Sequence, residues 1–211
     1  DGMIVYSPFH SIGLFSIFDT DYIRSVDVFS AAFPAKYGGR VSSIMDIRTK
    51  MPDFKSISGK VNINPISSGI MIEGPLTKQK KDKVGGNGFL LSARRAYLDK
   101  TSPSLYSYAN NDLATDSVQG FPYSFTDIYG KLVFSDGLNS LNLFGLYNKD
   151  DVNYEFPSNI GWEQYGGGAK FRFLPAASNV IFSGNFSYSS FSSSLKATDE
   201  NFPRESSIAG F

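Results

Sequence analysis

Strict alternation of apolar and polar residues is the main pattern of the chain from about residue 125 onward. In the segment TDIYGKLVF, one side carries apolar residues and the other carries charged or hydroxyl-bearing ones. The two sets are Ile128, Leu132 and Phe134 against Asp127, Tyr129 and Lys131. Because successive side chains of a strand point to opposite faces, this pattern predicts strands near 125–134, 141–149, 165–174 and 180–190.

The connections between these segments alternate in length. Short ones at 135–140, which contains Asp-Gly, and at 175–179 predict tight hairpin turns. Long polar stretches at 98–124 and 149–164 predict loops, and we expect the carboxylates of KDD at 149–151 to be solvated. Short turns that alternate with long loops are typical of outer-membrane barrels, whose strands span about 9 to 11 residues.

The region between residues 56 and 97 adds shorter or less regular strands. Partway along it, the alternating apolar residues shift from one strand face to the other, which predicts a bulge or a very tight hairpin from Pro65 to Ser68. In the next strand, near residue 89, the adjacent Arg94 and Arg95 must lie on opposite faces. The sequence therefore predicts an all-β dominated fold with about seven antiparallel strands and no helix after residue 50.

Two observations favour a membrane barrel over a soluble two-sheet sandwich, whose strands also alternate. Lys170 and Arg172 lie in mid-strand on the polar side, which suits a water-filled lumen. Aromatic residues near the predicted strand ends suit the girdle of a barrel, namely Tyr123, Tyr147, Tyr188 and Phe191. The sandwich stays open as the alternative.

Composition narrows the classes of partner and chemistry. Lys plus Arg and Asp plus Glu both number 20, so no net charge attracts the chain to nucleic acid. The chain contains no cysteine, which excludes disulfides, thiolate zinc sites and thiol nucleophiles within it. No run of about 18 apolar residues is present, so the sequence predicts no transmembrane helix. An aromatic content of 15% suits β-sheet surfaces.

Residues 1–50 resemble the end of the plug domain of TonB-dependent outer-membrane receptors. The segment IRSVDVFSAAFPAKYGG places a strand at 23–28, and Tyr37-Gly38 follows nine residues after Val28. The segment DIRTK, at 46–50, resembles the motif with which such plugs end. The opening DGMIVYSPFHSIGLFSIF resembles the form common in Bacteroidota, and EGPL at 73–76 resembles the end of an early barrel strand.

The resemblance implies two parts, with residues 1–55 as the C-terminal part of a plug domain and 56–211 as the N-terminal portion of an outer-membrane β-barrel. A barrel wide enough to need a plug has about 22 strands, so we expect this incomplete barrel to be a portion of a longer chain. The implied function is active transport of a scarce solute across the bacterial outer membrane. The solute would be a siderophore, cobalamin, an oligosaccharide or a peptide.

The resemblance also implies the partners. They are outer-membrane lipid, a solute of one of these classes and the TonB complex, which would act through a segment absent from this sequence. A surface lipoprotein is a further candidate partner. Because no catalytic constellation is recognisable, we expect no enzymatic activity, no cofactor, no metal site and no nucleic-acid partner.

The candidate ligand-binding residues come from the opening segment. By the resemblance, the loop after Asp1-Gly2 lies at the outer apex of the plug and contacts the captured solute. We expect aromatic stacking and one titratable hydrogen-bonding group from Tyr6, Phe9, His10 and Phe15. The alternative is that Phe9, Phe15 and Phe18 only pack the plug interior. His10, the single histidine, has no Ser and Asp at a spacing typical of a catalytic triad.

Two other functions stay open. A soluble all-β adhesion or carbohydrate-binding module would use the aromatic loops as its binding face. A passive barrel without energy coupling is a third possibility, against which the plug-like residues 1–50 argue. In the barrel interpretation, we expect the glycines at 166–168 to flatten the wall where the plug backbone passes.

Overall fold

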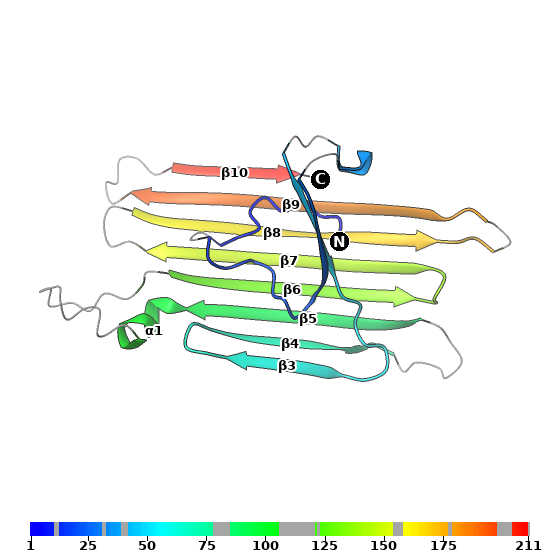
Figure 1. Ribbon diagram of the computed structural model, residues 1–211, viewed down its shortest axis with the longest axis horizontal. Helices are drawn as coiled ribbons and strands as arrows, with labels where there is room; N and C mark the ends of the chain where they lie inside the picture. The colour runs from blue at the N-terminus through cyan, green and yellow to red at the C-terminus, as the bar shows by residue number, and fades with distance from the viewer. Residues whose placement is uncertain are drawn as a thin grey trace, which may run out of the picture.

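The computed structural model describes residues 1–10, 13–30, 33–38, 42–77, 85–105, 121, 123–153, 158–176, 179–197 and 204–210. Strands dominate these residues, as the alternation predicted (Figure 1). In this described part, they form one eight-stranded antiparallel sheet and one two-stranded antiparallel pair. No helix in the same ranges is long and apolar enough to cross a membrane.

The large sheet is a meander, in which each strand pairs with the next one along the chain (Figure 1). Its strands are β3 (Ser58–Ile63), β4 (Ser67–Pro75), β5 (Gly86–Tyr97), β6 (Tyr123–Ser135), β7 (Ser140–Asn153), β8 (Ser158–Phe173), β9 (Phe182–Ala197) and β10 (Arg204–Gly210). This order puts neighbours in sequence side by side throughout the sheet, which is the simplest way to satisfy their backbone hydrogen bonds.

Two of the predicted tight turns are confirmed. Between β6 and β7, Gly137 has a φ of 97°, a conformation that costs glycine little because it lacks a Cβ. Between β3 and β4, the side chain of Asn64 accepts hydrogen bonds from the backbone N–H groups of Ile66 and Ser67, both at 2.9 Å. An asparagine that bonds to the backbone two residues on is a common way to close a turn.

The two faces of the sheet differ in charge and in exposure, and β6 shows this most clearly. Asp127 and Lys131 are only 6% and 4% exposed, whereas Ile128 between them is 48% exposed. The side of β6 that carries charge is therefore covered by protein, and its apolar side is open. This confirms the two sets of residues that the alternation predicted.

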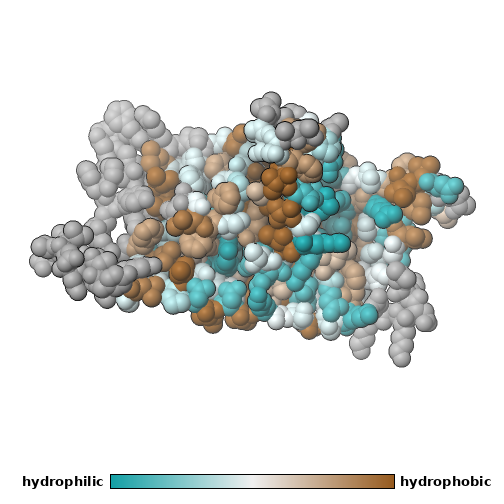
Figure 2. All heavy atoms as spheres, viewed as in Figure 1, coloured by the Kyte–Doolittle hydropathy of each residue, from teal (hydrophilic) through white to brown (hydrophobic). Residues whose placement is uncertain are grey.

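The covering layer on the charged face is formed by the described residues among the first fifty (Figure 1). β1 (Ile23–Phe29) and β2 (Ile44–Thr49) pair antiparallel and cross the strands of the large sheet, with a short 3-10 helix, η1 (Ala35–Tyr37), between them. The described residues of 1–22, called here the N-terminal segment, loop over β5 to β9. Viewed from the same side, Figure 2 shows the outer surface of this layer and of the sheet around it as a mixture of hydrophilic and hydrophobic residues.

A hydrophobic cluster joins the covering layer to the sheet. Tyr22 stacks on Tyr129 of β6 with ring centroids 4.4 Å apart and planes 11° apart. The cluster consists of Ile17, Tyr22, Met71, Leu90, Tyr129, Phe144 and Leu146. Full burial of a large apolar side chain stabilises a fold by about 1.5–3 kcal/mol, so this cluster is a major part of what holds the two layers together.

Polar contacts attach the ends of the covering layer to the same face. Lys131 of β6 donates to Oγ1 of Thr49 at 2.8 Å, and Thr49 donates to the carboxylate of Asp1 at 2.5 Å. Farther along, Lys50 pairs with Glu73 at 3.0 Å and Lys60 pairs with Asp21 at 2.6 Å. Lys60, Glu73 and Lys131 of the sheet are thus paired with groups of the layer above it.

The motif around Tyr37 has a local structural role in the β1–β2 pair. Asp27 and Asp46 lie directly opposite each other, which places two negative charges together. Arg48 lies 3.1 Å from the carboxylate of Asp27 and 3.2 Å from that of Asp46, and the hydroxyl of Tyr37 donates to Asp46 at 2.7 Å. Burial raises the pKa of Asp46, but these hydrogen bonds outweigh it and hold the pKa below its ordinary value of 3.8.

Two expectations about the elements after residue 50 were wrong. The helix α1 (Leu98–Leu105) follows β5, where the sequence predicted only loop from 98 to 124; residues 106–120 and 122 of that range lie outside the described part. The sheet also has eight described strands rather than about seven, because β10 was not predicted. Residues of α1 include Ser, Thr and Pro, which are poor helix formers, and the helix depends on packing through the buried Leu98 and Ser102.

The predicted loop at 149–164 was also wrong over most of its length. β7 continues to Asn153 and β8 begins at Ser158, while 154–157 lie outside the described residues. Two of the four predicted girdle aromatics, Tyr123 and Phe191, lie on the covered face: Tyr123 is fully buried and Phe191 contacts Tyr6 of the N-terminal segment. The alternation of side chains along a strand explains this error, because both residues lie on the same face as the buried charged residues.

Candidate functional site

The N-terminal segment forms a closed loop that presents His10 to the sheet. The N–H of His10 donates to the carbonyl of Phe15 at 2.9 Å, and the N–H of Ile17 donates to the carbonyl of Pro8 at 3.2 Å. Gly13, with a φ of 70°, donates back to the carbonyl of His10 at 2.7 Å. These bonds fix the backbone of the loop, so that the imidazole is directed onto β6 and β7.

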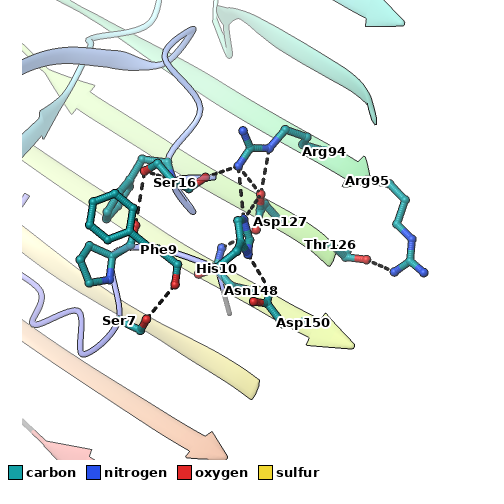
Figure 3. A network of polar contacts seen from close by, with 12 residues as sticks. Ser7, Phe9, His10, Ser16, Arg94, Arg95, Thr126, Asp127, Asn148 and Asp150 are labelled. Carbon is teal, nitrogen blue, oxygen red and sulfur yellow. Dashed lines mark hydrogen bonds and ion pairs between the residues drawn. The ribbon is translucent and has the colours of Figure 1, made fainter. Parts of the chain in front are cut away.

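His10 lies between two carboxylates of the sheet (Figure 3). Its Nδ1 is 2.5 Å from Oδ1 of Asp150 in β7, and its Nε2 is 3.2 Å from Oδ2 of Asp127 in β6. The imidazole ring stacks on Phe125, with centroids 3.8 Å apart. The side chain of His10 is fully buried, and those of Asp127 and Asp150 are 8% and 5% exposed.

Arg94 of β5 completes this cluster. Its guanidinium is 2.6 Å from Oδ2 of Asp127 and donates to the carbonyl of Ser16 at 2.5 Å, so one side chain contacts both layers. Arg95 points away from the cluster, as the sequence predicted for adjacent strand residues (Figure 3). Asn148 of β7 donates to the other oxygen of Asp127 at 2.8 Å.

The charges of this buried cluster balance when His10 is protonated. Burial by itself lowers the pKa of His10, but the hydrogen bonds and charges of Asp127 and Asp150 outweigh it and raise the pKa above its ordinary value of 6.5. Two carboxylates then face one imidazolium and one guanidinium. Loss of either cation would leave a buried carboxylate short of a partner, which is costly in a medium of low dielectric constant.

The four predicted ligand-binding residues do not lie together as one exposed surface. Phe9 is 47% exposed, while His10 is enclosed by the ionic cluster. Phe15 packs against Tyr123 and Phe125 of β6, at centroid distances of 6.4 and 5.7 Å. In this conformation Phe15 is therefore a packing residue, and the ring of His10 contacts a solute only if the loop moves.

Tyr6 lies at the other side of the N-terminal segment. Its backbone N–H and that of Ser7 both donate to Oε1 of Gln164 in β8, each at 3.2 Å. Its ring lies 6.5 Å from that of Phe191. Tyr6 and Phe9 thus flank the start of the loop, beside a small cavity of about 20 Å³ lined by Trp162, Gln164 and other residues of β7 to β9.

One of the expected wall contacts is present at Gly166. A Cβ on this glycine would lie 2.6 Å from the sulfur of Met3 in the N-terminal segment and 2.6 Å from the backbone oxygen of Tyr188. The absence of a side chain at Gly166 leaves room for the side chain of Met3, whereas the atoms nearest a Cβ at Gly167 and Gly168 belong to the sheet itself.

The sequence analysis missed the partners of His10. Asp150 was expected to be a solvated loop residue, but it is 4% exposed on the covered face of β7. Asp127 and Arg94 were placed on strands without any role. The available signal was their position: each is a charged residue on the polar side of an alternating strand, and such residues need a partner once that side is covered.

Comparisons with protein-family models, with curated proteins and with solved structures find no match for this chain. The geometry itself defines what the site can do. It holds a covering segment on a charged sheet face by a buried ionic cluster, and next to it leaves a small cavity lined mainly by apolar and aromatic surface. In the described part of the chain, no group of His, Cys, Asp or Glu residues is arranged to hold a metal ion.

Proposed function

We propose that this chain is part of a TonB-dependent transporter that carries a scarce solute across the bacterial outer membrane. In this proposal residues 1–55 are the end of the plug domain, and residues 56–211 are the first strands of the barrel that surrounds it. The N-terminal segment and the β1–β2 pair would then lie in the lumen, and the apolar face of the sheet would contact lipid.

The observation that carries the proposal is the distribution of side chains on β6. Asp127 and Lys131 are buried beneath the covering layer, while Ile128 on the opposite face is 48% exposed. In water, open apolar faces are disfavoured, because exposure of a large apolar side chain costs about 1.5–3 kcal/mol. In a bilayer the same apolar face is favoured, because it contacts lipid. A polar lumen filled by a plug accounts for the buried charges on the opposite face.

The same exposure extends to the neighbouring strands. The large apolar residues that are open on this face include Ile70, Ile72, Leu91, Leu132, Phe134, Leu141, Leu143, Phe182 and Phe186. They lie on β4, β5, β6, β7 and β9, and the exposed Tyr165 and Phe173 of β8 complete an apolar surface that continues across the sheet. A surface of this extent supports contact with lipid along the whole wall.

The proposed mechanism follows from how the covering layer is attached. Capture of a solute at the outer side would shift the N-terminal segment, and force applied through the TonB complex would separate the layer from the wall. The contacts to be broken are the ionic cluster around His10, the polar contacts of Thr49 and Lys50, and the hydrophobic cluster around Tyr22 and Tyr129. Water that enters the lumen can replace the polar contacts, whereas the applied force would have to separate the apolar cluster.

A deletion strain tests this proposal. The parent strain and a strain without the gene are grown in the same defined medium, and depletion of solutes is followed by mass spectrometry. We expect one solute class to stay in the medium of the deletion strain, and also in that of the parent treated with a protonophore. We further expect the gene product in the outer-membrane fraction. A product that is soluble without detergent would contradict the proposal and favour the soluble adhesion or carbohydrate-binding module.

A further inference from the structure

A hollow lies on the open apolar face of the sheet, across β3 to β6. It measures about 370 Å³, which is within the range of about 300–1,000 Å³ that is usual for ligand sites. Most of its lining residues alternate along their strands with the covered ones, so the hollow is on the side away from the covering layer. Its apolar walls include four exposed residues, Val61, Ile63, Ile70 and Ile128.

The hollow spans two rows of residues that pair with one another across the strands. The row nearer to α1 consists of Ile63, Ser68, Arg95 and Thr126. The next row on the same face consists of Val61, Ile70, Ala93 and Ile128. The first row carries polar side chains and the second carries none, so side chains that can bind a headgroup lie at one end of the hollow only.

Arg95 is an exposed cation on this otherwise apolar part of the face. Its guanidinium donates to Oγ1 of Thr126 (Figure 3). The described residues provide no carboxylate for Arg95, whereas Asp127 pairs with the neighbouring Arg94 on the covered face. A guanidinium has five N–H donors, and the hydroxyl of Thr126 keeps its own hydrogen for donation. The two side chains can therefore bind an external anion together.

The position of Arg95 along the strands matches the boundary of a bilayer. Its row continues into Lys149 of β7 and Glu163 of β8, whereas the apolar row continues into Tyr147 and Tyr165. In outer-membrane barrels, tyrosines lie at the level of the headgroups, at the edge of the apolar band. In the proposed wall, Arg95 is therefore at the level of headgroup phosphates, and the apolar row is at the level of the first acyl carbons.

We propose that the hollow binds one anionic lipid. Arg95 and Thr126 donate hydrogen bonds to phosphate oxygens of the headgroup, and an acyl chain lies along the apolar row. The planar guanidinium suits a phosphate, which it can bind through two N–H groups at once. A zwitterionic lipid carries an ammonium group close to its phosphate, and Arg95 repels that group. The inference rests on the proposed contact of this face with lipid, but not on the transport of a solute.

Native mass spectrometry of the full-length gene product tests the site. The protein is stripped of lipid in detergent and then titrated with phosphatidylglycerol, which is anionic, or with phosphatidylcholine that has the same acyl chains. We expect the wild type to retain one phosphatidylglycerol per chain. We also expect it to bind this lipid about tenfold more tightly than phosphatidylcholine, as a hydrogen bond between charged groups implies.

Arg95→Gln and Lys149→Gln form a matched pair of variants. Each removes a cation from the same row, but Lys149 does not line the hollow and lies 3.6 Å from the carboxylate of Asp151. We expect Arg95→Gln to bind phosphatidylglycerol about tenfold more weakly, and Lys149→Gln to bind it as the wild type does. Ala93→Phe, which places a ring in the hollow, should weaken the binding of both lipids, and it tests the site if Arg95→Gln does not fold.

The outcomes separate this site from the proposed function. Equal affinities of the wild type for the two lipids, or equal losses in Arg95→Gln and Lys149→Gln, would overturn the proposal. Displacement of the lipid by inorganic phosphate at millimolar concentration would show a site for anions only, and a dimer in place of the lipid adduct would assign the hollow to a second copy; both results also overturn it. None of these results contradicts the proposed function, which fails instead if the protein is soluble without detergent.

Discussion

Nδ1 of His10 lies 2.5 Å from Oδ1 of Asp150, although 140 residues separate them in the sequence. This contact joins the tip of the N-terminal loop to the face of β7, and Asp127 of β6 holds the other nitrogen of the same ring. The histidine is therefore one of the points at which the covering layer is fixed to the sheet. Its contribution is electrostatic and depends on pH, unlike that of the stacked rings of Tyr22 and Tyr129.

Replacement of His10 by Ala should loosen the N-terminal segment without unfolding the sheet. The change removes the imidazolium between Asp127 and Asp150, and loss of one partner of a buried ion pair costs about 3–5 kcal/mol. Hydrogen exchange should show faster exchange at residues 8–17 and little change in β6 and β7. Leu14→Ala is the matched control, since Leu14 is 74% exposed. Equal exchange in the two variants would show that His10 does not hold the segment. We also expect His10→Ala to weaken solute uptake.

The attachment of the segment should weaken as pH rises. The pKa of His10 is raised in the folded protein, so its stabilising contribution is complete below the ordinary value of 6.5 and is lost as pH rises through the folded value. The charged groups that face His10 are Asp127, Asp150 and Arg94. Limited proteolysis between pH 6 and pH 9 should therefore cut the segment faster at the alkaline end. In His10→Gln, the rate of cleavage should not rise with pH in this way. A parallel pH profile in both proteins would argue against attachment through protonated His10.

Gly166→Ala should destabilise the protein, whereas Gly145→Ala should not. A Cβ at Gly166 meets Met3 and a backbone oxygen at 2.6 Å, whereas the nearest atom to a Cβ at Gly145 is 3.6 Å away. Overpacking of a close contact costs about 1–3 kcal/mol. Thermal unfolding of the purified protein measures the difference, and equal midpoints for the two variants would contradict the close passage of the segment.

Tyr37→Phe should weaken the β1–β2 pair by about 1 kcal/mol, through loss of the hydrogen bond from the hydroxyl to Asp46. The pKa of Asp46 should rise, because this bond is one of the interactions that hold it below its ordinary value. Hydrogen exchange of the β2 amides measures the first effect. Protection that is unchanged at Ile44–Thr49 would mean that the hydroxyl does not stabilise the pair.

The faces of the long strands could be predicted from the sequence because period two is a local property. The segment around Ile128 contains enough residues of each kind to assign both faces of β6 without knowledge of any partner. The same rule placed Arg94 and Arg95 on opposite faces. Where the pattern was applied to single aromatics near strand ends, as for Tyr123 and Phe191, the period was ignored and the prediction was wrong.

The helix α1 and the strand β10 could not be predicted, because each depends on contacts outside its own residues. The helix contains Pro103 and is stabilised by a hydrogen bond from Ser102 to the carbonyl of Leu98 and by the burial of Leu98. The residues of β10 are mostly small or polar and pair with β9 through their backbones. Propensity alone favours neither element.

The ionic cluster could not be predicted from the sequence for a related reason. His10 is separated from Asp127 by 117 residues and from Asp150 by 140, so no motif spacing connects them. Only the topology of the meander, combined with the path of the N-terminal segment, brings the three side chains together. Tyr6, Phe9 and Phe15 could be named as candidates because aromatic residues in an opening loop are recognisable locally, but their surroundings could not be predicted.

The central claim, that the apolar face of the sheet contacts lipid, is tested most directly by spin labels on β6. The 211 residues contain no cysteine, so single cysteines at 128 and 132 can be labelled and compared with one at Arg95 near the strand end. In the protein reconstituted into bilayers, labels at 128 and 132 should collide frequently with oxygen, which concentrates in lipid, and rarely with a water-soluble nickel complex. Labels at 128 and 132 that collide mainly with the nickel complex, or with neither reagent, would contradict the account.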